Sequence, residues 1–167
     1  KEVLGTKRRL EWFREFAANI EEIKGSKLDL SNIEKVELTR TIDLWMISQL
    51  NQHIKNATEA LEVFQTRQAL QDSLFLLKKD IDHYLYRVKH LIDSQDPAII
   101  YVLSTVLENW IRLLAPFTPH TSEELWSKYG GEGFVSEASW PEYDSELVSL
   151  EIEKSEELVQ NIIKDIT

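Results

Sequence analysis

The chain has 167 residues, which is enough for one domain and short for two. It contains no cysteine, which excludes disulfide scaffolds, thiol catalysis and zinc fingers, and no apolar run of about 18 residues, which argues against a membrane span. The net charge of −10 would by itself argue against nucleic acid as a partner.

The charge is unevenly distributed along the chain, however. Residues 1–90 hold 15 Lys and Arg against 14 Asp and Glu, whereas residues 91–167 hold 4 against 15. The acidity therefore belongs almost wholly to the C-terminal half. An RNA-binding surface, if the protein has one, is expected in the first ninety residues.

Helical spacing of apolar residues dominates the sequence, and only five glycines and four prolines interrupt it. We predict an all-α fold: a bundle of four to five main helices, a short helix after a proline corner and an irregular loop. The expected helices cover 2–24, 34–63, 66–92, 97–115, 121–129 and 145–165, and the expected loop covers 130–144. All of them are assigned to a single domain, 1–167.

Local signals mark several helix ends. Asp96 before Pro97 combines an N-cap with a proline at the first helical position. Pro116 and Pro119 end the preceding helix, because proline lacks a backbone donor and disfavours helix in the residue before it. Thr121 with Glu124 matches a capping box for the short helix.

The two ends of the chain suggest a longer protein. The sequence begins at a lysine instead of a methionine, and the acidic helix at 145–167 reaches the last residue without a helix-breaking residue. We therefore expect a fragment whose last helix leads towards a further C-terminal module.

The sequence offers no convincing catalytic or metal site. Asp80 and His83 have the i, i+3 spacing of a di-iron bundle, but such a site needs that motif twice, with two further glutamates. Neighbouring carboxylates on a helix point about 100° apart and do not converge on one atom. We predict no catalytic residue and no metal ligand.

Basic and aromatic residues are more suggestive, since Lys and Arg neutralise phosphates and tyrosine stacks on unpaired bases. They lie near the start, near the middle and near the end of the first ninety residues: Lys7, Arg8, Arg9, Arg14, Arg40, Tyr84, Tyr86, Arg87, Lys89 and His90. Ordinary solvated helix faces are the alternative explanation.

Three motifs in order resemble one known family. They are DLWMISQLN at 43–51, the proline corner LLAPFTPHTSEELW at 113–126 and SWPEYD at 139–144. Together they resemble the helical anticodon-binding-type domain of class I aminoacyl-tRNA synthetases for branched aliphatic amino acids. Pro119 followed by His120, and the segment at 66–85, are most similar to leucyl-tRNA synthetases of the archaeal and eukaryotic type. An isoleucyl or valyl enzyme is the alternative within the family.

The resemblance implies a parent enzyme that uses ATP with magnesium to attach leucine to tRNA(Leu) in the cytoplasm. It assigns the chemistry to other domains of the chain, so this fragment is expected to be non-catalytic and free of cofactor. Its expected partners are tRNA, held by backbone contacts, and the catalytic and C-terminal domains, with no membrane. The residues expected to hold tRNA are Lys7, Arg9, Arg14, Arg40, Arg87 and Lys89.

The sequence departs from the family pattern at Gly5, Leu44 and Gln49, where relatives carry polar or basic residues. These departures weaken base-specific anticodon reading and favour a grip on the RNA backbone. A second hypothesis is a helical protein-interaction module, in which an apolar stripe docks into a partner groove. That stripe is Leu147, Leu150, Leu158 and Ile162, and we expect it to pack on its own bundle instead.

Overall fold

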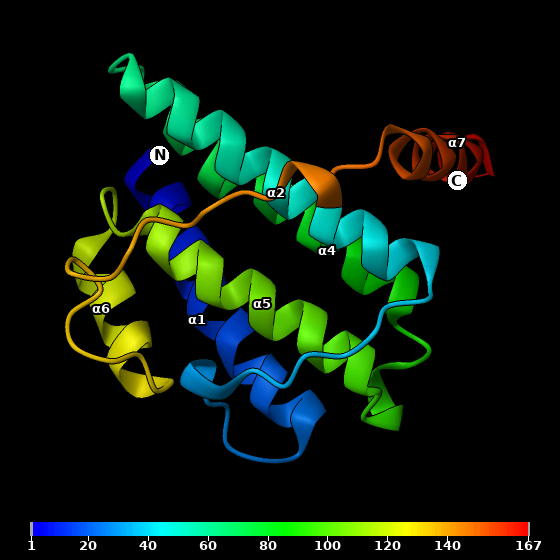
Figure 1. The fold of residues 1–167 in the computed structure, drawn as a ribbon, viewed down its shortest axis with the longest axis horizontal. Helices are drawn as coiled ribbons and strands as arrows, with labels where there is room; N and C mark the ends of the chain where they lie inside the picture. Colours follow the sequence, from blue (N-terminus) through cyan, green and yellow to red (C-terminus); the bar gives the residue numbers. More distant parts are fainter. Residues whose placement is uncertain (1, 167) are drawn as a thin grey trace. The chain divides into compact units, whose positions relative to one another are not determined.

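The structure is a computed structural model that describes residues 2–166, apart from the side chains of residues 2–7, 9, 93, 164 and 166. The described residues form helices and turns and no strand, as the predicted all-α class requires (Figure 1). The α-helices are α1 (Glu2–Lys24), α2 (Thr41–Glu62), α3 (Thr66–Leu70), α4 (Leu77–Val88), α5 (Pro97–Leu114), α6 (Pro119–Lys128) and α7 (Leu150–Ile166). Short 3₁₀ turns are η1 (Leu30–Asn32), η3 (Ile92–Ser94) and η4 (Ser145–Leu147), and η2 (Gln71–Leu76) is a π-helical turn.

The chain divides into two compact units, each built from two stretches of sequence. The first unit runs up to Val36 and resumes at His90–Pro141, and the second unit joins Glu37–Lys89 to the chain from Glu142 onward. The prediction of a single domain stays a prediction.

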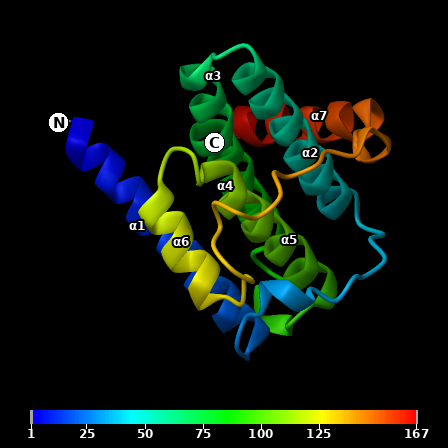
Figure 2. The same ribbon diagram turned by 60° about the vertical axis from the view of Figure 1, so that its left-hand side comes forward.

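The first unit packs α1 against α5 and α6 (Figure 2). Trp110 of α5 is fully buried at the centre of an aromatic cluster from α1. Its ring centroid lies 4.5 Å from that of Phe13, 5.5 Å from Trp12 and 5.8 Å from Phe16, in the tilted and edge-on arrangements that aromatic pairs favour. α5 is long and apolar enough to cross a membrane, and 56% of it is buried inside the protein, as in a core helix.

The second unit is built on α2 and α4, which lie side by side in both views (Figures 1 and 2). The segment α3–η2–α4 returns along α2 after a sharp turn at Phe64, which has a positive φ of 59°. α7 packs on α2, the helix of this unit that lies farthest from it in sequence.

Several predicted boundaries differ from the structure. Residues 34–40 are not helical, because α2 begins only at Thr41. The predicted helix 66–92 is interrupted by the π-turn and ends at Val88. The last helix begins at Leu150 after a separate 3₁₀ turn.

The short helix after the proline corner starts two residues earlier than predicted. α6 begins at Pro119, with Thr118 as its N-cap residue, so Thr121 lies inside the helix and the predicted capping box is wrong. Glu124 instead accepts hydrogen bonds from Arg14. The N-cap predicted at Asp96 is confirmed, since its carboxylate accepts from the N–H groups of Ala98 and Ile99.

Candidate functional site

Three of the six predicted basic residues make ion pairs within their own units. Arg14 Nη2 lies 2.7 Å from Glu124 Oε2, and Arg40 Nε lies 2.6 Å from Asp43 Oδ2. Arg87 Nε lies 2.9 Å from a carboxylate oxygen of Glu156, which is 1% exposed. These guanidinium groups are engaged in ion pairs inside the protein, and their role towards RNA stays a prediction.

The other three predicted residues are Lys7, Arg9 and Lys89. The side chains of Lys7 and Arg9 lie outside the described residues, so their prediction also stays open. Lys89 is exposed, and its ammonium lies 4.2 Å from the centroid of the Tyr86 ring. Lys89 therefore stands beside an aromatic ring that is itself 49% exposed.

Lys89 and Tyr86 belong to a longer exposed line along α4. We call Phe75, Lys79, Tyr86 and Lys89 the α4 stripe. Phe75 is 40% exposed, and Lys79 is also exposed. Within α4, steps of seven and three residues return to nearly the same face of the helix, so Lys79, Tyr86 and Lys89 share one side, and Phe75 precedes them in the π-turn η2. Asp82 shares that side, and its carboxylate lies 2.6 Å from Lys78 Nζ.

Alternating aromatic and lysine side chains suit a single-stranded or irregular nucleic acid. The lysines can neutralise phosphates, and the rings offer stacking faces to unpaired bases. Sequence reasoning found Tyr86 and Lys89 but missed Phe75 and Lys79, because their exposure depends on the helix register. The signal available in the sequence was the recurrence of lysine and aromatic residues at helical spacing.

The DLW motif fixes α4 on α2. Asp43 is fully buried and accepts a 2.7 Å hydrogen bond from the Tyr84 hydroxyl, which is also buried. Two residues later, the Trp45 ring packs edge-on against His83, with centroids 5.2 Å apart. Both motif residues therefore hold the helix that carries the α4 stripe.

The last helix holds the same half of α4. Glu156 accepts hydrogen bonds from His83 Nε2 at 2.7 Å and from Arg87 Nε at 2.9 Å, both at the same oxygen. Charge-assisted hydrogen bonds of this length are among the stronger ones in proteins. The acidic helix therefore contributes to the support of the stripe.

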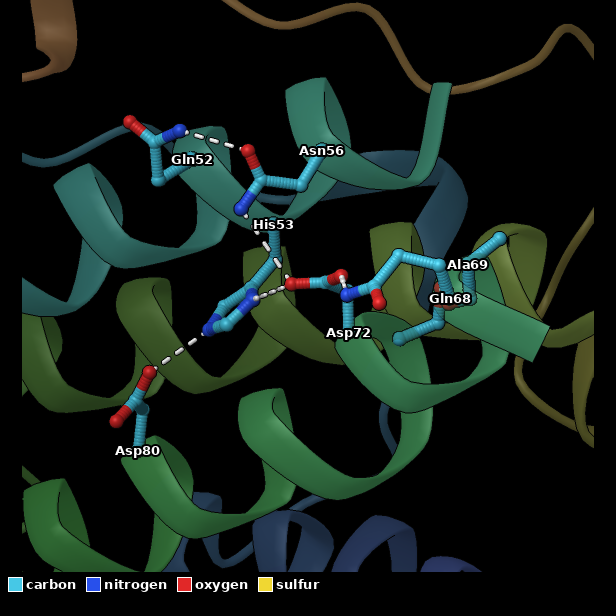
Figure 3. Close-up of polar contacts among 8 residues, drawn as sticks. Gln52, His53, Asn56, Gln68, Ala69, Asp72 and Asp80 are labelled. Carbon is cyan, nitrogen blue, oxygen red and sulfur yellow. Dashed lines mark hydrogen bonds and ion pairs between the residues drawn. The ribbon is translucent and has the colours of Figure 1, made fainter. Parts of the chain in front are cut away.

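A buried histidine joins the middle of the pair of helices (Figure 3). His53 of α2 is 5% exposed, and its Nε2 lies 2.7 Å from Asp80 Oδ2 of α4. Its Nδ1 lies 3.7 Å from Asp72 Oδ1 of the π-turn, an ion-pair distance too long for a hydrogen bond. Burial alone would lower the pKa of His53, but the two carboxylates outweigh burial and raise that pKa above its ordinary 6.5. Interaction with His53 lowers the pKa of Asp72 below its ordinary 3.8, against the opposing effect of burial.

These opposite shifts predict how the stability of the second unit depends on pH. A raised histidine pKa stabilises the fold fully below 6.5 and loses that effect as pH rises through the folded value. A lowered aspartate pKa stabilises fully above 3.8 and loses that effect as pH falls through the folded value. The free energy of unfolding of the wild type and of His53→Gln is measured by urea titration at about pH 5.5 and about pH 8.5. The difference between the two proteins should be smaller at the higher pH. A difference that is independent of pH would contradict this assignment.

The apolar stripe of the last helix does not pack as expected. Leu147, Leu150, Leu158 and Ile162 are 48%, 68%, 62% and 49% exposed. The expectation that these side chains pack on their own bundle is therefore wrong. The buried face of α7 is formed around Glu156 instead. The described residues contain no cluster of three His, Cys, Asp or Glu side chains arranged to hold a metal ion.

Comparison with known proteins agrees with this architecture. The chain is 50% identical over 165 residues to the leucine–tRNA ligase of Methanothermobacter thermautotrophicus, which covers 99% of this chain and 17% of that protein. It is 42% identical over 166 residues to the leucine–tRNA ligase of Pyrococcus furiosus, covering 99% of this chain and 16% of that protein. The chain thus spans about a sixth of the length of these relatives.

A solved structure shares the fold. The LeuRS chain in the ternary LeuRS–tRNA–LeuAMS complex from Agrobacterium radiobacter K84 matches 89% of this chain and 17% of its own, with a TM-score of 0.63 and 25% identity. The family described as the anticodon-binding domain of tRNA ligase matches residues 43–167, from the buried aspartate of the DLW motif onward. With this match over most of its length, the chain belongs to the anticodon-binding domains of tRNA ligases.

Proposed function

We propose that this chain is the tRNA-docking domain of a leucine–tRNA ligase, which in its full length attaches leucine to tRNA(Leu) using ATP. The observation that carries the proposal is the 50% identity to a leucine–tRNA ligase over 99% of the chain. Both relatives named above are leucine ligases, which favours leucine over the isoleucine and valine alternatives. The proposed setting is the cytoplasm.

The division of labour follows from the length of the relatives. The chain corresponds to about a sixth of a leucine–tRNA ligase, so the remaining five-sixths can supply the ATP site, its magnesium and the transfer of leucine. The part played by this domain is to bind tRNA and hold it in register for the other domains of the same chain. No step of the chemistry is assigned to its residues.

The α4 stripe is the proposed contact with tRNA. Its two lysines are exposed. Arg14, Arg40 and Arg87 instead form ion pairs with carboxylates of their own units. Tyr86, between the two lysines, and Phe75, which precedes them, add stacking faces. Of the predicted set, Lys89 enters this contact directly, and Lys7 and Arg9 stay candidates for a second contact.

Charge reversal in the stripe tests the proposal. We expect Lys79→Glu with Lys89→Glu to weaken tRNA binding by on the order of tenfold or more, because two phosphate contacts are lost and two repulsions gained. The dissociation constant is measured by fluorescence anisotropy with labelled tRNA.

A matched control keeps the net charge equal. Lys27→Glu with Lys35→Glu makes the same charge change at two exposed positions outside the stripe. This control should bind nearly as well as wild type. Equal losses in the two double variants would show that only the overall charge matters and would remove the stripe from the interface.

A second candidate function is a protein-interaction module, favoured by the exposure of Leu150, Leu158 and Ile162 on α7. Exposed apolar side chains that recur on one helix are typical of surfaces that bind a partner. Such a surface is compatible with tRNA docking through α4. If tRNA binding survives charge reversal both in the α4 stripe and in the first helix, the result favours the protein-interaction function.

A further inference from the structure

The turn at the C-terminal end of α2 carries a phenylalanine where helices usually place glycine. Val63 is the C-cap residue of α2, so Phe64 is the first residue beyond the cap. The N–H of Phe64 donates to the carbonyl of Leu61 at 3.0 Å. The N–H of Gln65 donates to the carbonyl of Ala60 at 2.7 Å. This pair of hydrogen bonds is a Schellman motif, in which the residue after the C-cap is left-handed and most often glycine.

Phe64 adopts this left-handed conformation, with a φ of 59°. A bulky side chain is strained there, because its Cβ lies too close to the backbone carbonyl. The end of α6 meets the same requirement with glycine. Gly130 follows the C-cap residue Tyr129 with a φ of 91°, and the N–H of Gly131 donates to the carbonyl five residues back. The turn itself therefore does not require a phenylalanine.

The Phe64 ring also contributes little to the fold. It is 89% exposed, more than any other large apolar side chain that the structure describes, and its neighbour Val63 is 61% exposed. A ring in solvent buries almost no apolar surface, so it does not offset the backbone strain. A residue that is strained and exposed at the same time points to binding, since strain that does not serve folding concentrates at functional sites.

The charges near this ring in sequence are balanced. Glu62 and Arg67 are both exposed, and Glu59 lies 3.9 Å from Lys55. The turn therefore carries no excess of positive charge that would hold phosphates. Its distinctive group is an aromatic face, on which any unpaired base can stack.

The turn is continuous with the α4 stripe. The chain runs from Phe64 through α3 and η2 into α4, and α3 lies at one end of the paired helices (Figure 2). Arg67, Gln71 and Phe75 are exposed along this segment. At 1.5 Å per residue, Phe64 lies about 16 Å beyond Phe75. A tRNA that lies along the stripe can therefore reach the ring at the end of the helices.

We propose that Phe64 stacks on an unpaired base of the tRNA and forms the outer end of the contact made by the α4 stripe. This inference rests on the proposed function of the stripe. Stacking uses the face of a base, so it adds affinity without reading the hydrogen-bonding edge. The strained phenylalanine is retained because glycine, which would relieve the strain, has no ring to stack.

Phe64→Gly tests the inference, because its expected effects on stability and on binding have opposite signs. Glycine relieves the left-handed strain and removes little packing, so the urea midpoint of unfolding should rise. The tRNA affinity, measured by fluorescence anisotropy, should fall about fivefold or more because the stacked ring is lost. A higher midpoint with unchanged affinity would overturn the inference. A lower midpoint would also overturn it, by showing that the ring stabilises the fold.

Two further substitutions distinguish stacking from general apolar contact. Phe64→Trp keeps an aromatic face and should bind tRNA within about twofold of wild type. Phe64→Leu keeps an apolar side chain without a ring and should lose nearly as much affinity as Phe64→Gly. Wild-type affinity in Phe64→Leu would contradict stacking. As a control, Phe134→Ala removes a ring that is 60% exposed in the first unit and should leave the affinity unchanged. An equal loss in this control would deny Phe64 a specific role.

Salt dependence separates the ring from the lysines of the stripe. Stacking releases no counterions, so Phe64→Gly should lower the affinity by the same factor at each salt concentration. Lys79→Glu with Lys89→Glu should change the slope of log affinity against log salt. If the lysine variant binds like wild type, the proposed function of the stripe fails and this inference fails with it. If the lysine effect stands and Phe64→Gly binds like wild type, only this inference fails.

Discussion

Replacing Trp110 by alanine should lower the free energy of unfolding of the first unit by about 3–5 kcal/mol. The ring is fully buried and touches Phe13, Trp12 and Phe16 of α1, so its removal leaves a cavity where two helices meet. Domains are typically stable by only about 5–15 kcal/mol, so this loss is a large fraction of the total. The measurement is urea unfolding followed by far-ultraviolet circular dichroism, which does not depend on the missing fluorophore.

The control for this prediction is another large aromatic residue in the same unit. Phe134 is 60% exposed, and Phe134→Ala should change the unfolding free energy by less than about 0.5 kcal/mol. A Trp110→Ala loss below about 1 kcal/mol would mean that the aromatic cluster is not the core of the first unit.

Asp43→Ala should lower the unfolding free energy of the second unit by about 2–3 kcal/mol. The substitution leaves the buried Tyr84 hydroxyl without its 2.7 Å acceptor and takes the 2.6 Å partner from Arg40. Arg40 is 29% exposed at its side chain and can be rehydrated, whereas Tyr84 is fully buried and cannot. Most of the cost therefore comes from losing the buried hydrogen bond between Tyr84 and Asp43.

A double-mutant cycle isolates that hydroxyl. Tyr84→Phe alone should cost about 1 kcal/mol, because it removes the donor and leaves a carboxylate that Arg40 still pairs. Tyr84→Phe combined with Asp43→Ala should cost less than the sum of the two single changes. Additive losses would show that the hydrogen bond between these residues contributes nothing to stability.

Much of the fold could be predicted because its helices obey simple local rules. Periodic apolar residues predicted α1 and α5 with their observed ends to within a residue, and Asp96 with Pro97 marked the start of α5. The prediction of a helix over residues 34–40 was wrong. These residues include good helix formers, but Val36 and Leu38 are only half-buried and the segment is not helical. Intrinsic propensity is a weak preference that tertiary packing overrides.

The π-turn could not be predicted for a related reason. An inserted residue shifts the helical phase by about 100°, but adjacent leucines at 76 and 77 hide that shift from any periodicity argument. The buried bridge of His53 depends on a partner 27 residues away, and the sequence drew attention to the neighbouring Asp80–His83 pair instead.

Only part of the candidate site could be predicted from the sequence, because the exposure and pairing of its side chains depend on contacts between distant residues. Lys89 could be named from its charge, but the pairing of Arg14 and Arg87 depends on carboxylates 110 and 69 residues away. Phe75 and Lys79 became candidates only once the structure showed that both side chains are exposed. Charge alone could not distinguish a structural arginine from an exposed lysine.

The salt dependence of tRNA binding tests the central claim most directly. Affinity is measured over a range of salt concentrations for the wild-type domain, for Lys79→Glu with Lys89→Glu, and for Lys27→Glu with Lys35→Glu. If the stripe contacts the tRNA backbone, the slope of log affinity against log salt should become shallower by about 1.4–1.8 in the stripe variant and stay unchanged in the control. Slopes and affinities that are the same for all three proteins would contradict docking of tRNA through the α4 stripe.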